Sequence, residues 1–180
     1  MILFLIGYMG AGKTTIGRLL AKKLNCSFID VDCFIENRYH QTIAKIFEEK
    51  GEAGFREIER RALLEISSYE NVVVSTGGGL PCFFDNMEIM NRAGITIFLK
   101  DNIDELVKRL NFNKQKRPLI KEKTPEELRN FIEISLEKRE PFYTQAKYIY
   151  DVKKCSTKQE MNQWVEDLFV QISNATGERK

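Results

Sequence analysis

Residues 7–14 read Gly-Tyr-Met-Gly-Ala-Gly-Lys-Thr, and two contrasting hydrophobic patterns flank them. The continuous apolar run over residues 2–6 predicts a strand that is buried on both faces. A stripe with helical spacing follows the glycines, formed by Ile16, Leu19, Leu20 and Leu24. Strand, glycine-rich turn and helix in this order match the pattern G-x-x-x-x-G-K-[ST], in which backbone N–H groups surround a polyphosphate. The segment therefore predicts a nucleotide-binding loop.

Residues of this loop have separate expected tasks. Lys13 is expected to reach the β- and γ-phosphates, and the Thr14 hydroxyl to bind Mg²⁺. The remaining residues expected to contact ATP are Gly10, Ala11, Gly12 and Thr15. The pattern indicates nucleotide binding without distinguishing a switch, a motor or a kinase.

Apolar runs and helical stripes alternate along the rest of the chain. Further strands are predicted at residues 27–32, 72–76, 95–99 and 147–150, with helices between them. Among these helices, one is expected from Phe83 to Arg92, and another from Thr124-Pro125 to Arg139, ended by Pro141. This alternation predicts an α/β fold with a parallel sheet covered on both faces and ligands beyond the carboxyl ends of the strands.

Bulk properties restrict the classes of partner. The 180 residues fit one domain, and 28 basic against 26 acidic residues give a net charge of +2, so neither nucleic acid nor a membrane is an expected partner. The scattered Cys26, Cys33, Cys82 and Cys155 and a single His40 disfavour a zinc site and suit the cytoplasm. We expect a monomer, since every helical apolar stripe can be assigned to the core.

Two aspartates form the second candidate site. The strand at 72–76 ends without an acidic residue, so a carboxylate for Mg²⁺ is expected from Asp30 or Asp32. In an extended strand end, side chains two apart point the same way. Asp30 could then hold Mg²⁺ through water while Asp32 meets an acceptor hydroxyl. The alternative is a strand-to-helix turn in which Asp32 caps the next helix.

A basic stretch from Asn111 to Lys123 has the length and charge of a lid. An arginine on such a lid, here Arg117, could neutralise charge on a transferring phosphoryl group. The alternative is an ordinary solvated surface loop. Residues 113–116, Asn-Lys-Gln-Lys, do not match the guanine-binding pattern Asn-Lys-x-Asp, which disfavours a GTPase switch.

Six motifs in order resemble the shikimate kinase family. They are the nucleotide loop, Asp30-x-Asp32, Gly54-Phe55-Arg56-x-x-Glu59, Gly77-Gly78-Gly79, Lys116-Arg117-Pro118-Leu119 and Arg139-x-Pro141-x-Tyr143. The resemblance implies one domain over residues 1–180 with a fold similar to nucleoside monophosphate kinases: five parallel strands, a substrate region at about 32–61 and a lid at about 111–124. It also implies Mg²⁺-dependent transfer of the γ-phosphoryl group of ATP to the 3-hydroxyl of shikimate, with one Mg²⁺ per subunit.

The resemblance also implies residue roles. Asp32 would bind the shikimate hydroxyls as base or orienter, Arg56 and Arg139 would grip the carboxylate, and Gly78 would offer its N–H. Arg117 would be the lid arginine. Family members hold adenine between an arginine before the lid, at the position of Arg109, and a late loop, here around Lys153 and Lys154.

Two other functions are compatible with much of this pattern. One is a gluconate or nucleoside monophosphate kinase of the same fold, in which Arg56 and Arg139 face a different anion. The other is a nucleotide-dependent binding protein without turnover. The joint presence of Lys13, Thr14, both aspartates and the lid arginine argues against the second.

Overall fold

A parallel sheet forms the centre of the computed structural model, which describes residues 1–113, 120–152 and 157–176. Its five strands lie in the order β2-β3-β1-β4-β5. Their bounds are β1 Ile2–Ile6, β2 Ser27–Asp30, β3 Val72–Ser75, β4 Ile95–Lys100 and β5 Tyr148–Asp151. Phe4 in the central strand pairs with Val74 on one side and Thr96 on the other. The predicted parallel α/β fold is confirmed.

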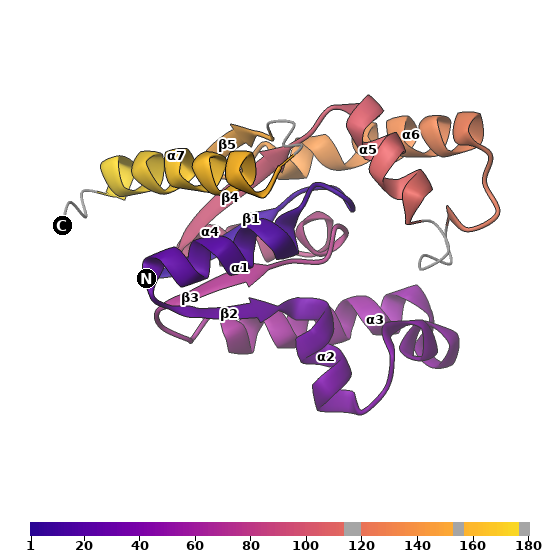
Figure 1. Ribbon diagram of the computed structural model, residues 1–180. Coiled ribbons are helices and arrows are strands. Elements are labelled where there is room, and N and C mark those ends of the chain that lie inside the picture. Colours follow the sequence, from indigo (N-terminus) through magenta and orange to yellow (C-terminus); the bar gives the residue numbers. More distant parts are fainter. Residues whose placement is uncertain (114–119, 153–156, 177–180) are drawn as a thin grey trace.

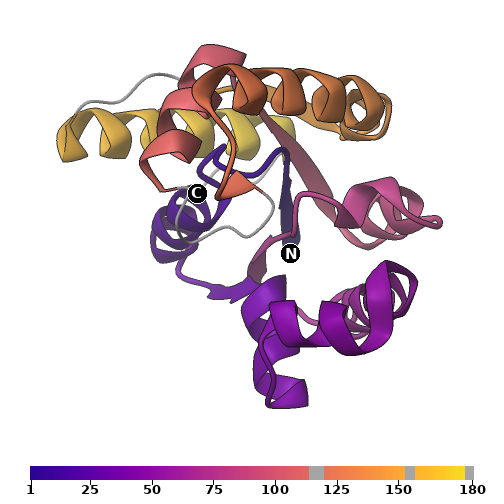
Figure 2. The same cartoon turned by 90° about the vertical axis from the view of Figure 1, so that its right-hand side faces the viewer.

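Helices cover both faces of this sheet. Their bounds are α1 Lys13–Leu24, α2 Val31–Tyr39, α3 Ile43–Ile66, α4 Asn86–Ala93, α5 Ile103–Phe112, α6 Pro125–Tyr143 and α7 Lys158–Thr176, with a short 3-10 turn, η1, at Leu80–Cys82. α1 and α7 lie over one face, and α3 and α4 lie over the other (Figures 1 and 2). α2, the start of α3 and α5 gather at the end of the sheet where β1 leads into α1 (Figure 1).

The core follows the predicted hydrophobic patterns. Every residue of β1 is buried, as its continuous apolar sequence requires. In α7 one apolar face supplies the buried residues Trp164, Val165, Leu168 and Ile172. The described helices include none that is both long and apolar enough to cross a membrane.

The second strand differs from its prediction in length and burial. It ends at Asp30, and its residues are exposed or only partly buried, so the expectation of a buried strand over 27–32 is wrong. β2 lies at the edge of the sheet and, among the residues that the structure describes, pairs only with β3. Val31 belongs to the apolar run on which the strand prediction was based. It is buried, but it is the first residue of α2.

Two helix boundaries also differ. Phe84 has φ 51°, a left-handed conformation that interrupts a helix, so α4 begins at Asn86 instead of Phe83. α6 continues through Pro141 to Tyr143. Helical hydrogen bonding continues past this proline, since the Thr144 N–H bonds to the Glu140 carbonyl at 2.9 Å.

Candidate active site

The glycine-rich loop after β1 has the backbone that its sequence predicts. Gly10 and Gly12 have φ values of 87° and 89°, a region in which side chains other than glycine are strained. Gly12 precedes the first turn of α1, so this helix N-terminus faces the loop. Lys13 is 8% exposed, and its Nζ donates to the carbonyls of Gly7 at 2.8 Å and Tyr8 at 2.9 Å. The ammonium group is thereby held at the centre of the loop.

Thr14 connects this loop to the second strand. Its hydroxyl donates to Asp30 Oδ2 at 2.8 Å and lies 3.4 Å from Ser75 Oγ. Hydroxyl and carboxylate oxygens are the donors that Mg²⁺ prefers, and Mg²⁺ commonly keeps few protein ligands while water and phosphate oxygens complete its shell. No group of three or more acidic, histidine or cysteine side chains arranged for a metal occurs in the described residues. Thr14 and Asp30 therefore fit a Mg²⁺ site that is shared with a nucleotide.

Asp30 and Asp32 are arranged differently from the expectation. Asp30 is the N-cap of α2, and its Oδ1 accepts from the backbone N–H groups of Asp32 at 3.2 Å and Cys33 at 3.4 Å. Asp32 lies in the first helical turn. Neither a shared extended strand end nor capping by Asp32 is therefore correct. The short strand and the capping preference of aspartate bring about this turn.

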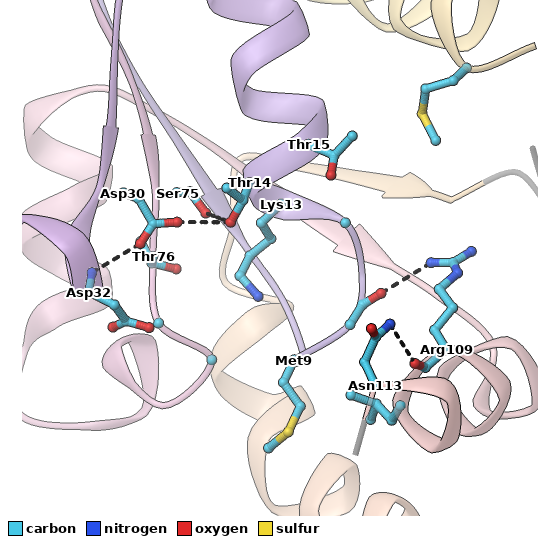
Figure 3. Close-up of a pocket in the computed structure, with 16 residues that line it drawn as sticks. Met9, Lys13, Thr14, Thr15, Asp30, Asp32, Ser75, Thr76, Arg109 and Asn113 are labelled. Carbon is cyan, nitrogen blue, oxygen red and sulfur yellow. Dashed lines mark hydrogen bonds between the residues drawn. The ribbon is translucent and has the colours of Figure 1, made fainter. Parts of the chain in front are cut away.

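Both aspartates nevertheless line one cavity of about 440 Å³. Lys13 lies at its centre, with Asp30 and Asp32 on one side and Arg109 on the other (Figure 3). Burial, with a contribution from the neighbouring charge of Asp30, raises the pKa of Asp32, while the charge of Lys13 opposes this shift. Other lining residues from the expected set are Gly10, Gly12, Thr14, Thr15 and Gly78.

The glycine run after β3 passes close to the expected acceptor residues. A Cβ on Gly77 would lie 3.1 Å from Asp32 Oδ1. A Cβ on Gly78 would lie 3.3 Å from the Met9 nitrogen and 3.4 Å from Arg139 Nη1. Asp32 and Arg139, far apart in the sequence, thus both approach this glycine run beside the nucleotide loop, because glycine leaves room for them.

Arg56 approaches the third glycine of the run. A Cβ on Gly79 would lie 2.7 Å from Arg56 Nη2. The guanidinium forms an ion pair with Glu59, which lies three residues further along the helix. It also bonds to Glu52 at 3.0 Å and lies 4.2 Å from the centre of the Phe83 ring. Burial raises the pKa of Glu59 to about 7, against the opposing effect of Arg56. Arg56 is therefore fixed by carboxylates and by a ring.

Arg139 is half-buried and is supported by aromatic residues. The Tyr143 hydroxyl interacts with Arg139 and donates to the Gly78 carbonyl at 2.6 Å. Burial raises the pKa of Tyr143. In the sequence, Tyr143 is only one residue of the motif Arg139-x-Pro141-x-Tyr143; its role as a link between α6 and the glycine run becomes visible in the structure.

Arg109 lies at the opposite end of the cavity, where adenine was expected. Its Nη1 donates to Asp101 Oδ2 at 2.6 Å and to the Gly10 carbonyl at 3.2 Å. Burial raises the pKa of Asp101, and the charge of Arg109 opposes this shift. The sequence carried no signal for Asp101, since one acidic residue after a strand resembles any surface position.

The remaining predicted residues either lie outside the described residues or do not line the cavity. Arg117 and the middle of the expected lid, residues 114–119, lie outside the described residues, as do Lys153 and Lys154. His40 is exposed at the end of α2, as expected, and Cys26, Cys33 and Cys82 are free thiols. Ala11 is buried in the loop instead of lining the cavity.

The five-stranded parallel sheet and the phosphate loop between β1 and α1 define a P-loop protein of the nucleoside monophosphate kinase type. A family model described as shikimate kinase matches residues 9–169. A shikimate kinase of Bacteroides thetaiotaomicron is 53% identical over 166 residues, which make up 92% of this chain and 95% of that protein. The chain belongs to the shikimate kinase family.

Solved structures agree with this assignment. The crystal structure of shikimate kinase from Bacteroides thetaiotaomicron is similar with a TM-score of 0.93 at 51% identity, covering 96% of this chain and 98% of that one. Shikimate kinase from Acinetobacter baumannii in complex with shikimate has a TM-score of 0.83 at 33% identity, covering 96% of this chain and 93% of that one.

Proposed function

We propose that this chain transfers the γ-phosphoryl group of ATP to the 3-hydroxyl of shikimate, giving shikimate 3-phosphate and ADP. The observation that carries the proposal is that Asp32, Arg139 and Arg56 each approach one glycine of the same run, which lies beside the phosphate loop. The solved complex of the Acinetobacter baumannii relative with shikimate supports the same acceptor.

The acceptor end of the proposed site matches the chemistry of shikimate. One carboxylate is complemented by the two guanidinium groups of Arg56 and Arg139, which can form charge-assisted hydrogen bonds. The ring hydroxyls are bound by Asp32 and by the N–H of Gly78. Glu59 fixes the orientation of Arg56, so the acceptor meets an arginine that is already in position.

The nucleotide end is built from the loop and Arg109. Lys13 would leave the Gly7 and Tyr8 carbonyls and bond to the β- and γ-phosphates, assisted by the loop N–H groups. The adenine ring would stack on Arg109, which Asp101 holds in place. Arg117 remains the predicted lid arginine that stabilises the transferring group, within a lid at about 111–124.

Asp32 orients the acceptor hydroxyl for in-line attack. In a loose transition state the hydroxyl proton leaves late, so positioning of the oxygen contributes more than early deprotonation. Burial raises the pKa of Asp32, which makes its carboxylate a better acceptor for this proton after the transfer. The phosphate loop and Lys13 stabilise the charge on the γ-phosphoryl oxygens.

Thr14 and Asp30 would hold one Mg²⁺ per subunit, Thr14 by its hydroxyl and Asp30 through water. When bound, the ion neutralises charge on the β- and γ-phosphates. We also propose that the protein is a cytoplasmic monomer and that its acceptor region spans about residues 32–61.

Phosphorus NMR of the reaction product tests the position of transfer. Incubation with ATP, Mg²⁺ and shikimate is expected to give a phosphomonoester whose phosphorus couples to the proton on C3. Coupling to the proton of another ring carbon would reject the assignment of Asp32 as the residue that orients the 3-hydroxyl.

A further inference from the structure

Tyr8 occupies the first variable position of the phosphate loop, and its side chain is 1% exposed. The pattern G-x-x-x-x-G-K-[ST] places no demand on this position. The Arg139 Cζ atom lies 5.5 Å from the centre of the Tyr8 ring, within the distance at which a guanidinium is attracted to an aromatic face. A loop residue that no phosphate requires thus contacts the proposed carboxylate ligand.

The backbone of the same residue belongs to the nucleotide side. The Tyr8 carbonyl accepts from Lys13 Nζ at 2.9 Å. Tyr8 therefore contacts the lysine of the phosphate loop through its carbonyl and the arginine of the acceptor site through its ring.

Arg139 is enclosed at this point. On one side it interacts with the Tyr143 hydroxyl, which also bonds to the Gly78 carbonyl. The Gly78 position is so close to Arg139 that an added Cβ would lie 3.4 Å from Nη1. The Tyr8 ring supplies a further surface against which the guanidinium can be held. A flexible arginine side chain loses conformational freedom when it binds an anion, and prior contacts reduce that cost.

We propose that Tyr8 is a positioning residue for Arg139, and that its ring holds the guanidinium in the orientation that receives the acceptor carboxylate. The inference rests on the proposed function, because it takes Arg139 as a carboxylate ligand. It assigns to the phosphate loop a second task, which is to shape the acceptor site.

Calorimetric dissociation constants of Tyr8→Leu and Tyr8→Phe test the proposal. Leucine fills part of the space without an aromatic face, so Tyr8→Leu is expected to weaken shikimate binding roughly tenfold. Tyr8→Phe keeps the ring and is expected to stay within about threefold of the wild type. ADP binding should change less than about threefold in both variants, because the backbone of the loop holds the phosphates.

A matched control removes another ring that lies beneath a cation. Lys23 Nζ is 5.0 Å from the centre of the Phe169 ring, on α1 and α7 away from the acceptor site. Phe169→Leu is expected to leave the shikimate constant unchanged. An equal loss of shikimate affinity in Phe169→Leu and Tyr8→Leu would show that the effect is general destabilisation, and it would overturn the proposal.

Two further measurements separate positioning from general damage to the loop. Shikimate methyl ester lacks the charged carboxylate, so its binding should not respond to Tyr8→Leu. In an Arg139→Ala background, Tyr8→Leu should weaken shikimate binding by less than about twofold, because the residue through which it acts is gone. A full tenfold loss in that background, or an equal loss of ester or ADP binding, would overturn the proposal.

The wild-type titration distinguishes this proposal from the function on which it rests. No shikimate binding to the wild type would reject the proposed function itself. Binding that Arg139→Ala weakens and Tyr8→Leu leaves intact would retain the function and reject the role of Tyr8.

Discussion

Glu59 is 1% exposed and forms an ion pair with Arg56. The two residues lie one turn apart in α3, and the Arg56 guanidinium reaches the glycine run after β3. A buried carboxylate is costly unless it is paired, so its presence beside Arg56 indicates that this guanidinium is held in place as a binding group.

Loss of either proposed carboxylate ligand should act on one substrate. Arg56→Ala and Arg139→Ala are each expected to raise the apparent shikimate constant about 10- to 100-fold and the ATP constant by less than about threefold. Steady-state kinetics with each substrate varied separately measures both. Arg60→Ala is the control, because Arg60 lies on the same helix and pairs with Asp85 outside the site. Equal effects on the two substrates would contradict the assignment.

The raised pKa of Glu59 predicts a dependence of stability on pH. Its pKa is about 7 in the folded chain against a usual value of 4.5, so the folded state keeps a proton that the unfolded chain releases. The contribution of Glu59 to stability is thus complete below about pH 4.5 and is lost as pH rises through about 7. Between these values, the unfolding free energy of the wild type relative to Glu59→Gln should fall by up to about 3 kcal/mol.

Urea unfolding of both proteins at pH 4.5 and pH 8 measures this difference. If the wild type instead gains stability over Glu59→Gln as pH rises, the attraction of Arg56 exceeds the cost of burial, and the predicted direction is wrong.

The glycine run predicts a substitution that harms binding more than folding. In Gly79→Ala, the added Cβ would lie 2.7 Å from Arg56 Nη2, so the guanidinium must move. We expect the shikimate constant to rise roughly tenfold or more, since small misplacements of binding groups are costly. Gly51→Ala is the contrast, because nothing lies within 4 Å of its Cβ while its φ of 67° strains alanine.

Gly51→Ala should therefore lose about 1–3 kcal/mol of stability and keep its shikimate constant. The pair is compared by thermal unfolding and by kinetics. An unchanged shikimate constant in Gly79→Ala would show that Arg56 has other productive positions.

The Thr14 hydroxyl, 2.8 Å from Asp30, predicts a difference between two conservative variants. Thr14→Val keeps the shape and removes the oxygen, so kcat should fall on the order of 100-fold. Thr14→Ser keeps the oxygen and should remain within about tenfold of the wild type, with a similar Mg²⁺ concentration for half-maximal rate. Equal activity of both variants would remove Thr14 from the proposed Mg²⁺ site.

The sequence was sufficient for the strands of the sheet and for the phosphate loop, because both depend on local patterns. The sequence was insufficient where contacts between distant segments of the chain determine the local structure. Nothing in residues 27–32 indicates that β2 is an edge strand, and hence that the chain turns at Asp30 to cap α2. Tyr8 is a variable position of its motif, and only the fold brings Arg139 to its ring.

The most direct test of the central claim is a coupled assay for ADP release by the wild type with MgATP. Shikimate, gluconate, several nucleoside monophosphates and a blank without acceptor are compared. The account predicts rapid release with shikimate and only background release with the others. Background release with shikimate but turnover with another acceptor would contradict the acceptor site formed by Asp32, Arg56 and Arg139.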